Sequence, residues 1–175
     1  MTIDYNKVEP FGLGQYARRA SLESSVWLLG GLWGFLADSE DTNGQFSVIE
    51  IMAPKGLEPA RHVHHREDES FYVLEGKITY YVGEETYESG PGTFVFLPRG
   101  VPHSFTFETD VVRMLTISAP AGIEELFRDP SFSEPAQALT LPPPPTGPPD
   151  MVALVEEAAS YGVEIVGPPG PPEQR

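Results

Sequence analysis

The sequence has 175 residues, 40% hydrophobic and 11% aromatic, which is enough for one domain with a sizeable core and rather short for two. Its formal net charge of -15 repels phosphates, so we expect neither a nucleic acid nor an anionic membrane surface as a partner. The absence of cysteine excludes disulfides and thiolate metal sites, so any metal ion must be held by nitrogen and oxygen ligands.

Residues 1–25 show no clear pattern of hydrophobic and polar residues. They also lack the features of an export signal, which are a basic start followed by an apolar run and a cleavage site. The longest apolar stretch, Val26 to Leu36, is interrupted by glycines and falls well short of the roughly 20 residues that a membrane helix needs. This stretch predicts N-terminal strands. We expect a soluble protein located in the cytoplasm.

Residues 26–118 contain short β-rich runs separated by turn residues. Strands are predicted over residues 46–52, 70–74, 77–82, 92–97, 103–107 and 111–117. The two runs on either side of Glu75-Gly76 predict a hairpin with a two-residue loop. Strands repeating at intervals of about 8–12 residues favour a sandwich or barrel over βαβ units.

Most of the prolines follow residue 118. A short helix is predicted over residues 123–127, and the proline-rich residues 141–149 predict an extended spacer. Asp150 is suited to cap a helix from Met151 to Tyr161, because its carboxylate can accept from the first free backbone amides.

These patterns predict two parts of the chain. Residues 1–140 form a β-barrel domain that includes the N-terminal strands. Residues 141–175 form a proline-rich spacer, a helix that caps the barrel, and a flexible tail from Gly167 onward.

Three of the four histidines lie close together, at His62, His64 and His65. If this segment is a strand, alternation points His62 and His64 to one face and His65 to the other. Such a pair alone is a weak signal, because surface strands often carry one. Glu69 and the remote His103 add a carboxylate and a third imidazole, which together make a mixed nitrogen and oxygen site for a divalent first-row metal ion.

The spacing of these residues resembles the two motifs of the cupin superfamily. The first motif is matched at every fixed position, by Gly56, His62, His64, Glu69 and Gly76. The second is matched up to its last position, by Gly92, Pro98, Gly100 and His103. The asparagine that ends the second motif is replaced by Phe107, which removes a polar group without touching the ligands.

The resemblance implies an all-β fold, a double-stranded β-helix or jelly-roll barrel, here with short C-terminal helices. It also implies that His62, His64, Glu69 and His103 point into the barrel mouth and hold one divalent transition metal ion. Ni, Fe, Mn, Co, Cu and Zn all accept this ligand set. Single-domain cupins are commonly dimers, so we expect a homodimer whose apolar N-terminal strands pair across the interface.

Residues next to the predicted ligands have simpler expected roles. Family spacing favours Glu69 as the carboxylate ligand, and Glu67 and Asp68 are expected to be solvated turn residues. Alternation places His65 at the surface or behind the ligands, and Arg61 is expected to form a surface salt bridge.

Within the superfamily, the single domain, the ligand set and the proline-rich C-terminal extension are similar to small bacterial quercetin 2,3-dioxygenase-like proteins. The resemblance implies an enzyme that uses dioxygen to open the ring of a flavonol or a similar aromatic enol. Glu69 would then be both a ligand and the base that takes the substrate's hydroxyl proton.

The predicted inner faces carry four candidate substrate-binding residues, namely Phe71, Val73, Phe105 and Phe107. Filling the barrel core is the simpler role for each of them. Two alternatives to the dioxygenase stay open: a metal-dependent isomerase or hydrolase of a small polar substrate, and a non-catalytic cupin that binds a metal or a small molecule.

Overall fold

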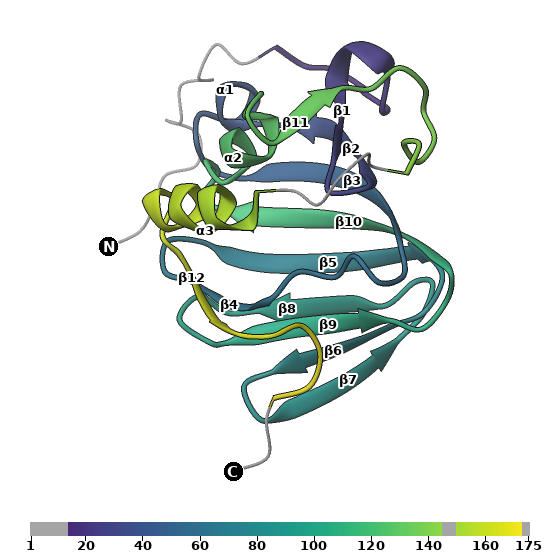
Figure 1. The fold of residues 1–175 in the computed structure, drawn as a ribbon. Helices are drawn as coiled ribbons and strands as arrows, with labels where there is room; N and C mark the ends of the chain where they lie inside the picture. The colour runs from purple at the N-terminus through teal and green to yellow at the C-terminus, as the bar shows by residue number, and fades with distance from the viewer. Residues whose placement is uncertain (1–13, 145–149, 173–175) are drawn as a thin grey trace, which may run out of the picture.

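The computed structural model describes residues 14–144 and 150–172, and within these ranges the chain is built mainly from two antiparallel sheets (Figure 1). The larger sheet has the strand order β11 (Ser133–Pro135), β1 (Ser25–Leu28), β2 (Gly31–Ala37), β3 (Ser47–Pro54), β10 (Val111–Ala119), β5 (Asp68–Glu75), β8 (Phe94–Leu97). The smaller sheet has the order β12 (Val163–Gly167), β4 (Arg61–His64), β9 (His103–Phe107), β6 (Ile78–Val82), β7 (Glu85–Ser89).

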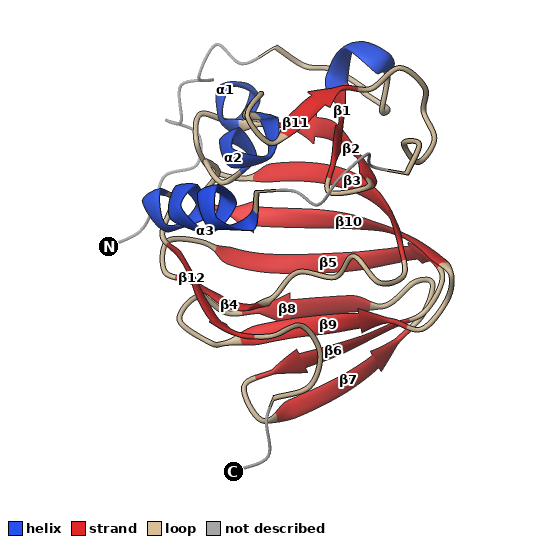
Figure 2. Cartoon of the chain, viewed as in Figure 1, coloured by secondary structure: helices blue, strands red, loops and turns tan. Residues whose placement is uncertain are grey.

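The described helices are short and gather toward one end of the sheets (Figure 2). They are a 3₁₀ turn η2 (Leu22–Ser24) and the α-helices α1 (Ser39–Thr42), α2 (Glu124–Arg128) and α3 (Met151–Ser160). None of the helices in the described part of the chain is long and apolar enough to cross a bilayer.

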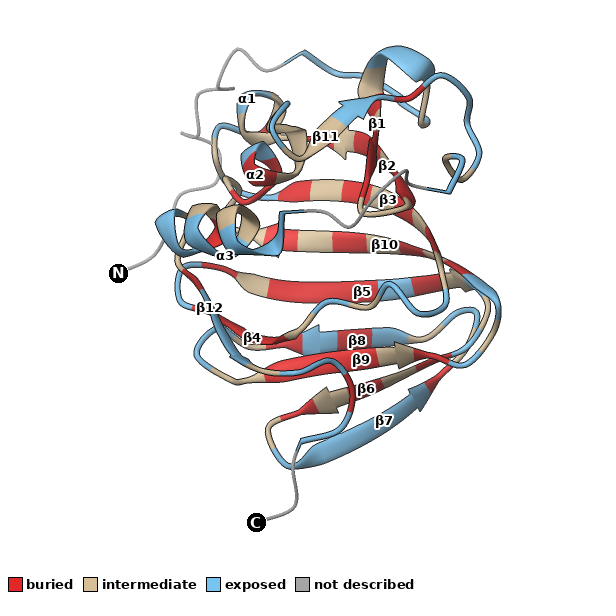
Figure 3. Cartoon of the chain, in the orientation of Figure 1, coloured by how far each residue is buried: buried red, intermediate tan, exposed pale blue. Residues whose placement is uncertain are grey.

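The core lies between the two sheets, because alternate residues of the central strands face inward. β3 and β10 alternate buried and partly buried residues along their lengths, and the outer strands β7 and β8 expose most of one face (Figure 3). The buried side chains form one hydrophobic cluster, which includes Phe35, Phe71 and Tyr80. Burying one such side chain contributes about 1.5–3 kcal/mol. The all-β jelly-roll barrel expected from the motifs is confirmed.

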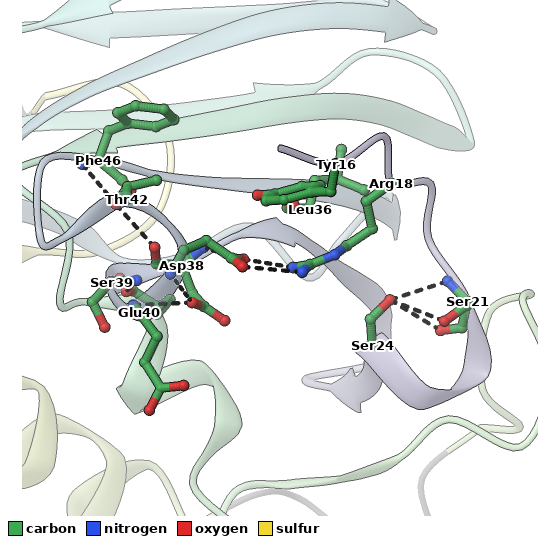
Figure 4. Close-up of polar contacts among 12 residues, drawn as sticks. Tyr16, Arg18, Ser21, Ser24, Leu36, Asp38, Ser39, Glu40, Thr42 and Phe46 are labelled. Atoms are coloured by element: carbon green, nitrogen blue, oxygen red, sulfur yellow. Dashed lines mark hydrogen bonds and ion pairs between the residues drawn. The ribbon is translucent and has the colours of Figure 1, made fainter. Parts of the chain in front are cut away.

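The N-terminal segment before η2 is tied to the turn at α1 by polar contacts (Figure 4). The Arg18 guanidinium donates to both carboxylate oxygens of Asp41, at 2.6 and 3.0 Å, and the Tyr16 hydroxyl donates to the Leu36 carbonyl at 3.0 Å. Asp38 caps α1 by accepting from the next free backbone amides, as the first turn of a helix requires. These contacts hold the first described residues against β2.

Most predicted elements form within one or two residues of their expected bounds. The strand at residues 103–107 and the helices at α2 and α3 are confirmed, and Asp150 caps α3 by accepting from the Ala153 amide at 3.0 Å. Residues 145–149 of the predicted spacer lie outside the described residues. The division of the chain at residue 140 stays a prediction.

The hairpin predicted at Glu75-Gly76 is wrong. β5 pairs with β10 and β8, whereas β6 pairs with β9 and β7, so Gly76 turns the chain from one sheet into the other. The glycine still has the positive φ that the turn signal implied, at 84°. A glycine with positive φ can form the turn of a hairpin or a corner between two sheets. Which of the two forms depends on the strands with which the flanking segments pair, and these are distant in sequence.

Three strands of the described chain were not predicted from the sequence, and one of them is β11, which pairs antiparallel with β1. β7 follows Gly83 and makes the actual hairpin with β6, and β12 pairs antiparallel with β4. The tail that was expected to be flexible is anchored where it follows β12. There the Pro168 carbonyl accepts from the Arg61 amide at 3.2 Å, and the Gly170 carbonyl accepts from the Ser104 hydroxyl at 2.6 Å.

Replacing Gly76 with alanine should destabilise the protein more than the same change at another positive-φ glycine. A Cβ at Gly76 would meet Thr109 Oγ1 at 2.6 Å and the Val111 carbonyl oxygen at 2.8 Å, whereas a Cβ at Gly92, with φ 88°, meets nothing within 4 Å. We expect Gly92→Ala to lower the free energy of unfolding by about 1–2 kcal/mol and Gly76→Ala by more than about 2 kcal/mol. Urea unfolding followed by tryptophan fluorescence measures both, and equal losses would contradict the corner packing.

Candidate metal centre

The four predicted ligand side chains converge, although they come from strands in both sheets. β4 supplies His62 and His64, β9 supplies His103, and β5 of the other sheet supplies Glu69. All four are buried, and one ligand atom from each lies within 4.8 Å of all the others. The pairing of β4 with β9 places His62 directly opposite His103.

The ring nitrogens of two of these histidines are oriented for a cation. His62 Nδ1 lies 2.7 Å from the Ala60 carbonyl and His103 Nδ1 lies 3.1 Å from the Val101 carbonyl. Because a carbonyl oxygen only accepts, both Nδ1 atoms donate. In a neutral ring the Nε2 atom then carries a lone pair, and the two Nε2 atoms face each other at 3.1 Å. Two facing lone pairs repel unless a cation lies between them.

The carboxylate of Glu69 also has an oxygen atom that lacks a hydrogen-bond partner among the described residues. This atom, Oε2, is buried 3.4 Å from His103 Nε2 and 3.8 Å from His64 Nε2. A buried ionised carboxylate needs a compensating charge. Ligand atoms bound at about 2.1 Å with right or tetrahedral angles lie about 3.0–3.4 Å apart. The separations of 3.1 and 3.4 Å match this range and that of 3.8 Å exceeds it slightly, so a small movement of the side chains would let them hold one divalent transition metal ion.

The pKa values of two of the four groups, His62 and Glu69, suit a metal site. Burial, reinforced by the neighbouring His103 and His64, lowers the pKa of His62 to about 4, so its ring is neutral at physiological pH. Burial alone would raise the pKa of Glu69, but the charges of His64 and His103 outweigh it and lower this pKa to about 2. A neutral imidazole and an ionised carboxylate are the forms that bind a metal ion.

Glu67 is not the solvated turn residue that the sequence predicted. It is 3% exposed, and its carboxylate accepts a hydrogen bond from His64 Nδ1. The chain bends directly after β4, which brings a carboxylate three residues later beneath the ring. This bond fixes the tautomer of His64, so that Nε2 points to the cluster. Asp68, by contrast, lies near the surface and pairs with Arg99 at 2.7 Å.

The pKa of His64 reflects this second carboxylate. Burial alone would lower the pKa of His64, but the charge of Glu69, the hydrogen bond that His64 donates to Glu67 and the charge of Glu67 outweigh it and raise this pKa. His65, the next residue, turns away as alternation predicted. Its exposed ring contacts the exposed Glu164 at 2.9 Å.

Arg61 is also placed differently from the expectation of a surface salt bridge. It is 9% exposed, and its guanidinium donates to the carbonyls of Gly83 at 2.9 Å and Pro102 at 3.0 Å and to the Ser104 hydroxyl at 3.2 Å. Burial lowers the pKa of Arg61. These bonds join β4 to the turn after β6 and to the start of β9, and so support the register between the ligand strands.

A cavity of about 190 Å³ lies beside the cluster, and His62, His64 and Glu69 form part of its wall. Among the predicted substrate-binding residues, Phe71, Phe105 and Phe107 line this cavity. Val73 is fully buried in the core and is not one of the lining residues.

The C-terminal helix completes the cavity wall, which the sequence analysis did not foresee. α3 contributes Met151, Leu154, Val155 and Ala158 to the lining. It packs against α2 and β12 through a small apolar cluster that includes Leu126 (Figure 1). The helical spacing of its apolar residues was the available signal for this packing.

Three comparisons with known proteins bear on the family. Residues 48–118 match the Cupin domain family. Quercetin 2,3-dioxygenase of Bacillus subtilis is 31% identical over 93 residues, which are 53% of this chain and 28% of that protein. An uncharacterized protein of Streptomyces coelicolor is 34% identical over 56 residues, which are 32% of this chain and 53% of that protein. The matched segments thus span 28% and 53% of these two curated relatives.

Among solved structures, the nucleoside dehydratase Pac13 of Streptomyces superposes with a TM-score of 0.50 at 16% identity, covering 63% of this chain and 88% of that chain. At this identity the likeness shows the fold alone. The antiparallel jelly roll and the two ligand motifs agree with the family match, so the chain contains a cupin domain over residues 48–118.

Proposed function

We propose that this protein is a metal-dependent dioxygenase that opens the ring of a flavonol or a similar aromatic enol. The observation that carries the proposal is a cluster of metal-ligand side chains in the wall of an otherwise apolar cavity. Among the described residues of that wall, only Thr116 adds a hydroxyl group. A flat aromatic molecule gains hydrophobic stabilisation and ring contacts in such a cavity.

A divalent ion held by His62, His64, Glu69 and His103 would supply Lewis-acid polarisation of the substrate's enol oxygen. Glu69 is part of the cavity wall, and its carboxylate would accept the proton of the substrate's hydroxyl group. The rings of Phe71 and Phe105, which lie edge-to-face with centroids 5.5 Å apart, pack on the substrate and keep water from the cluster.

The two alternatives have weaker support. An isomerase or hydrolase of a small polar substrate needs several hydroxyl or cationic groups in its cavity, and the apolar lining disfavours it. A non-catalytic cupin would bind a metal or a ligand without consuming oxygen. The similarity to quercetin 2,3-dioxygenase supports the oxygenase, although it covers only 28% of that enzyme.

The purified protein should carry about one divalent transition metal ion per chain, and His62→Ala should remove it. Losing one of four ligands also removes the ring that faces His103 at 3.1 Å. His65→Ala is the matched control, because this exposed neighbouring ring points away from the cluster. Elemental analysis after dialysis measures the metal content of the parent protein and of both variants. Equal metal content in both variants would contradict the site.

Changing Glu67 to alanine should weaken metal binding about 10- to 100-fold, because His64 then loses the bond that orients its ring. The matched control is Glu164→Ala, which removes the carboxylate beside the exposed His65 and should leave metal affinity unchanged. Competition with a chromophoric chelator measures the metal dissociation constant of each variant. An equal effect of the two changes would show that Glu67 does not act through His64.

Oxygen uptake with a flavonol tests the reaction itself. We expect uptake by the metal-loaded protein, its loss after chelation, and a loss of at least about 100-fold in Glu69→Gln, measured beside the metal content of that variant. His65→Ala should retain the parent rate. The proposal fails if no metal from Ni, Fe, Mn, Co, Cu or Zn supports uptake.

The homodimer and the cytoplasmic location inferred from the sequence stay predictions. Light scattering of the purified protein measures its molar mass and so tests the homodimer directly.

A further inference from the structure

The larger sheet carries apolar side chains on its outer face as well as on its inner face. An antiparallel sheet with one face in water normally alternates apolar and polar residues along each strand. β8 is apolar at all four positions, and β10 directs Leu115 and Ile117 outward on either side of the buried Thr116. A sheet that is apolar on both faces is expected to be covered on both.

The outward side chains of four neighbouring strands form one surface, which we call the outer patch. The pairing register aligns one row across β8, β5 and β10 and a second row that continues onto β3. The rings of the outer patch are 57%, 52% and 38% exposed at Phe94, Phe96 and Tyr72, and Figure 3 shows the exposed residues on β8. The apolar members of the outer patch are Val48, Tyr72, Phe94, Phe96, Leu115 and Ile117.

The chain covers the other end of this outer face itself. Trp27 on β1 and Leu32 on β2 are buried there in a cluster with Ala136, which follows β11. Leu32 lies opposite Met52, and Met52 faces the same way as Val48 on β3. The outer face is therefore one apolar surface, which the chain buries at β1 and β2 and leaves exposed, among the described residues, at β5 and β8.

The charge of the outer patch favours a second copy of this chain as its cover. The net charge of -15 makes two copies repel each other over most approaches. At the border of the outer patch, however, the acidic groups are paired with arginines. Arg113 pairs with Glu50 and Glu75, each at 2.6 Å, and Arg99 pairs with Asp68 at 2.7 Å. Two acidic copies can meet through this patch with little repulsion, whereas a basic partner has its complement on the acidic surfaces.

The size and shape of the outer patch also suit a second copy. Its three exposed rings present roughly 300 Å² of surface per copy, which is about half of the ~600 Å² that each partner buries at the lower end of stable interfaces. The partly buried aliphatic members add to this area. Sheets pack face to face about 10 Å apart when their twists match, and two identical sheets have the same twist.

We infer that the outer patch is an interface between two copies of this chain, which pack their larger sheets face to face about a twofold axis. The sequence suggested the N-terminal strands instead, but β1 and β2 each pair on both sides within the described sheet. Glu69 and Phe71 project from the opposite face of β5, so each copy keeps its own cavity. The interface is independent of the reaction that the cavity supports.

Sedimentation velocity over about 0.1–100 µM protein tests the interface. We expect the parent protein to reach twice the 19.2 kDa mass of one chain. Phe96→Glu and Tyr72→Glu should each weaken dimerisation at least about 100-fold, because a twofold interface contains every substitution twice. Tyr87→Glu is the matched control and should keep the parent dissociation constant, since this ring is 46% exposed on β7, at the edge of the other sheet.

Two further measurements separate a lost interface from a lost fold. Circular dichroism and metal content should match the parent in all three variants, and Phe96→Ser takes the place of a variant that does not fold. The urea midpoint should rise with protein concentration in the parent and in Tyr87→Glu, and stay constant in the patch variants.

A parent protein that is still monomeric at about 100 µM overturns the inference and leaves the outer patch to a partner of another kind. A dimer that persists unchanged in folded Phe96→Glu and Tyr72→Glu also overturns it, because the interface then lies elsewhere. The same holds if Tyr87→Glu weakens the dimer as much as the patch variants do.

Discussion

The convergence of three buried imidazoles and one buried carboxylate is the constraint on which the rest of this barrel depends. Backbone carbonyls accept from the Nδ1 atoms of His62 and His103 on the far side of each ring, so the two Nε2 atoms face each other at 3.1 Å. The carboxylate of Glu69 closes the same space with a buried, unpartnered oxygen. Buried donor atoms without protein partners are costly for the polypeptide alone and become favourable around a cation.

The rest of the barrel keeps these atoms together. Arg61 bonds the ligand strand β4 to the segments on either side of it, and Glu67 orients His64 from behind. Neither residue can contact a substrate, since both are buried behind the ligands. Metal proteins depend on such outer contacts, because a ligand free to rotate loses much of its affinity. The cavity that borders the cluster is lined mainly by apolar side chains.

Most of the strands and the four ligand positions could be predicted from the sequence, because they depend on local patterns of residues. The alternation in 103–107 and 111–117 sets strands and their inner faces, and the spacing from His62 to Glu69 places the ligands. What failed depends on contacts distant in sequence. The turn at Gly76 looks the same in a hairpin and in a corner between sheets. Glu67 and Arg61 are charged residues beside a turn, and only the packed barrel shows that they are buried.

The strand that carries two of the ligands receives its outer partner late in the chain. His64 pairs with Val163, roughly 100 residues further on, and the helix just before that strand closes the cavity. Contacts of such separation form slowly, because a long loop must close before they contribute stability. The last wall of the cavity comes from a part of the chain that supplies none of the four ligand side chains. Sequence changes in this part can alter the shape of the cavity and leave the ligand set as it is.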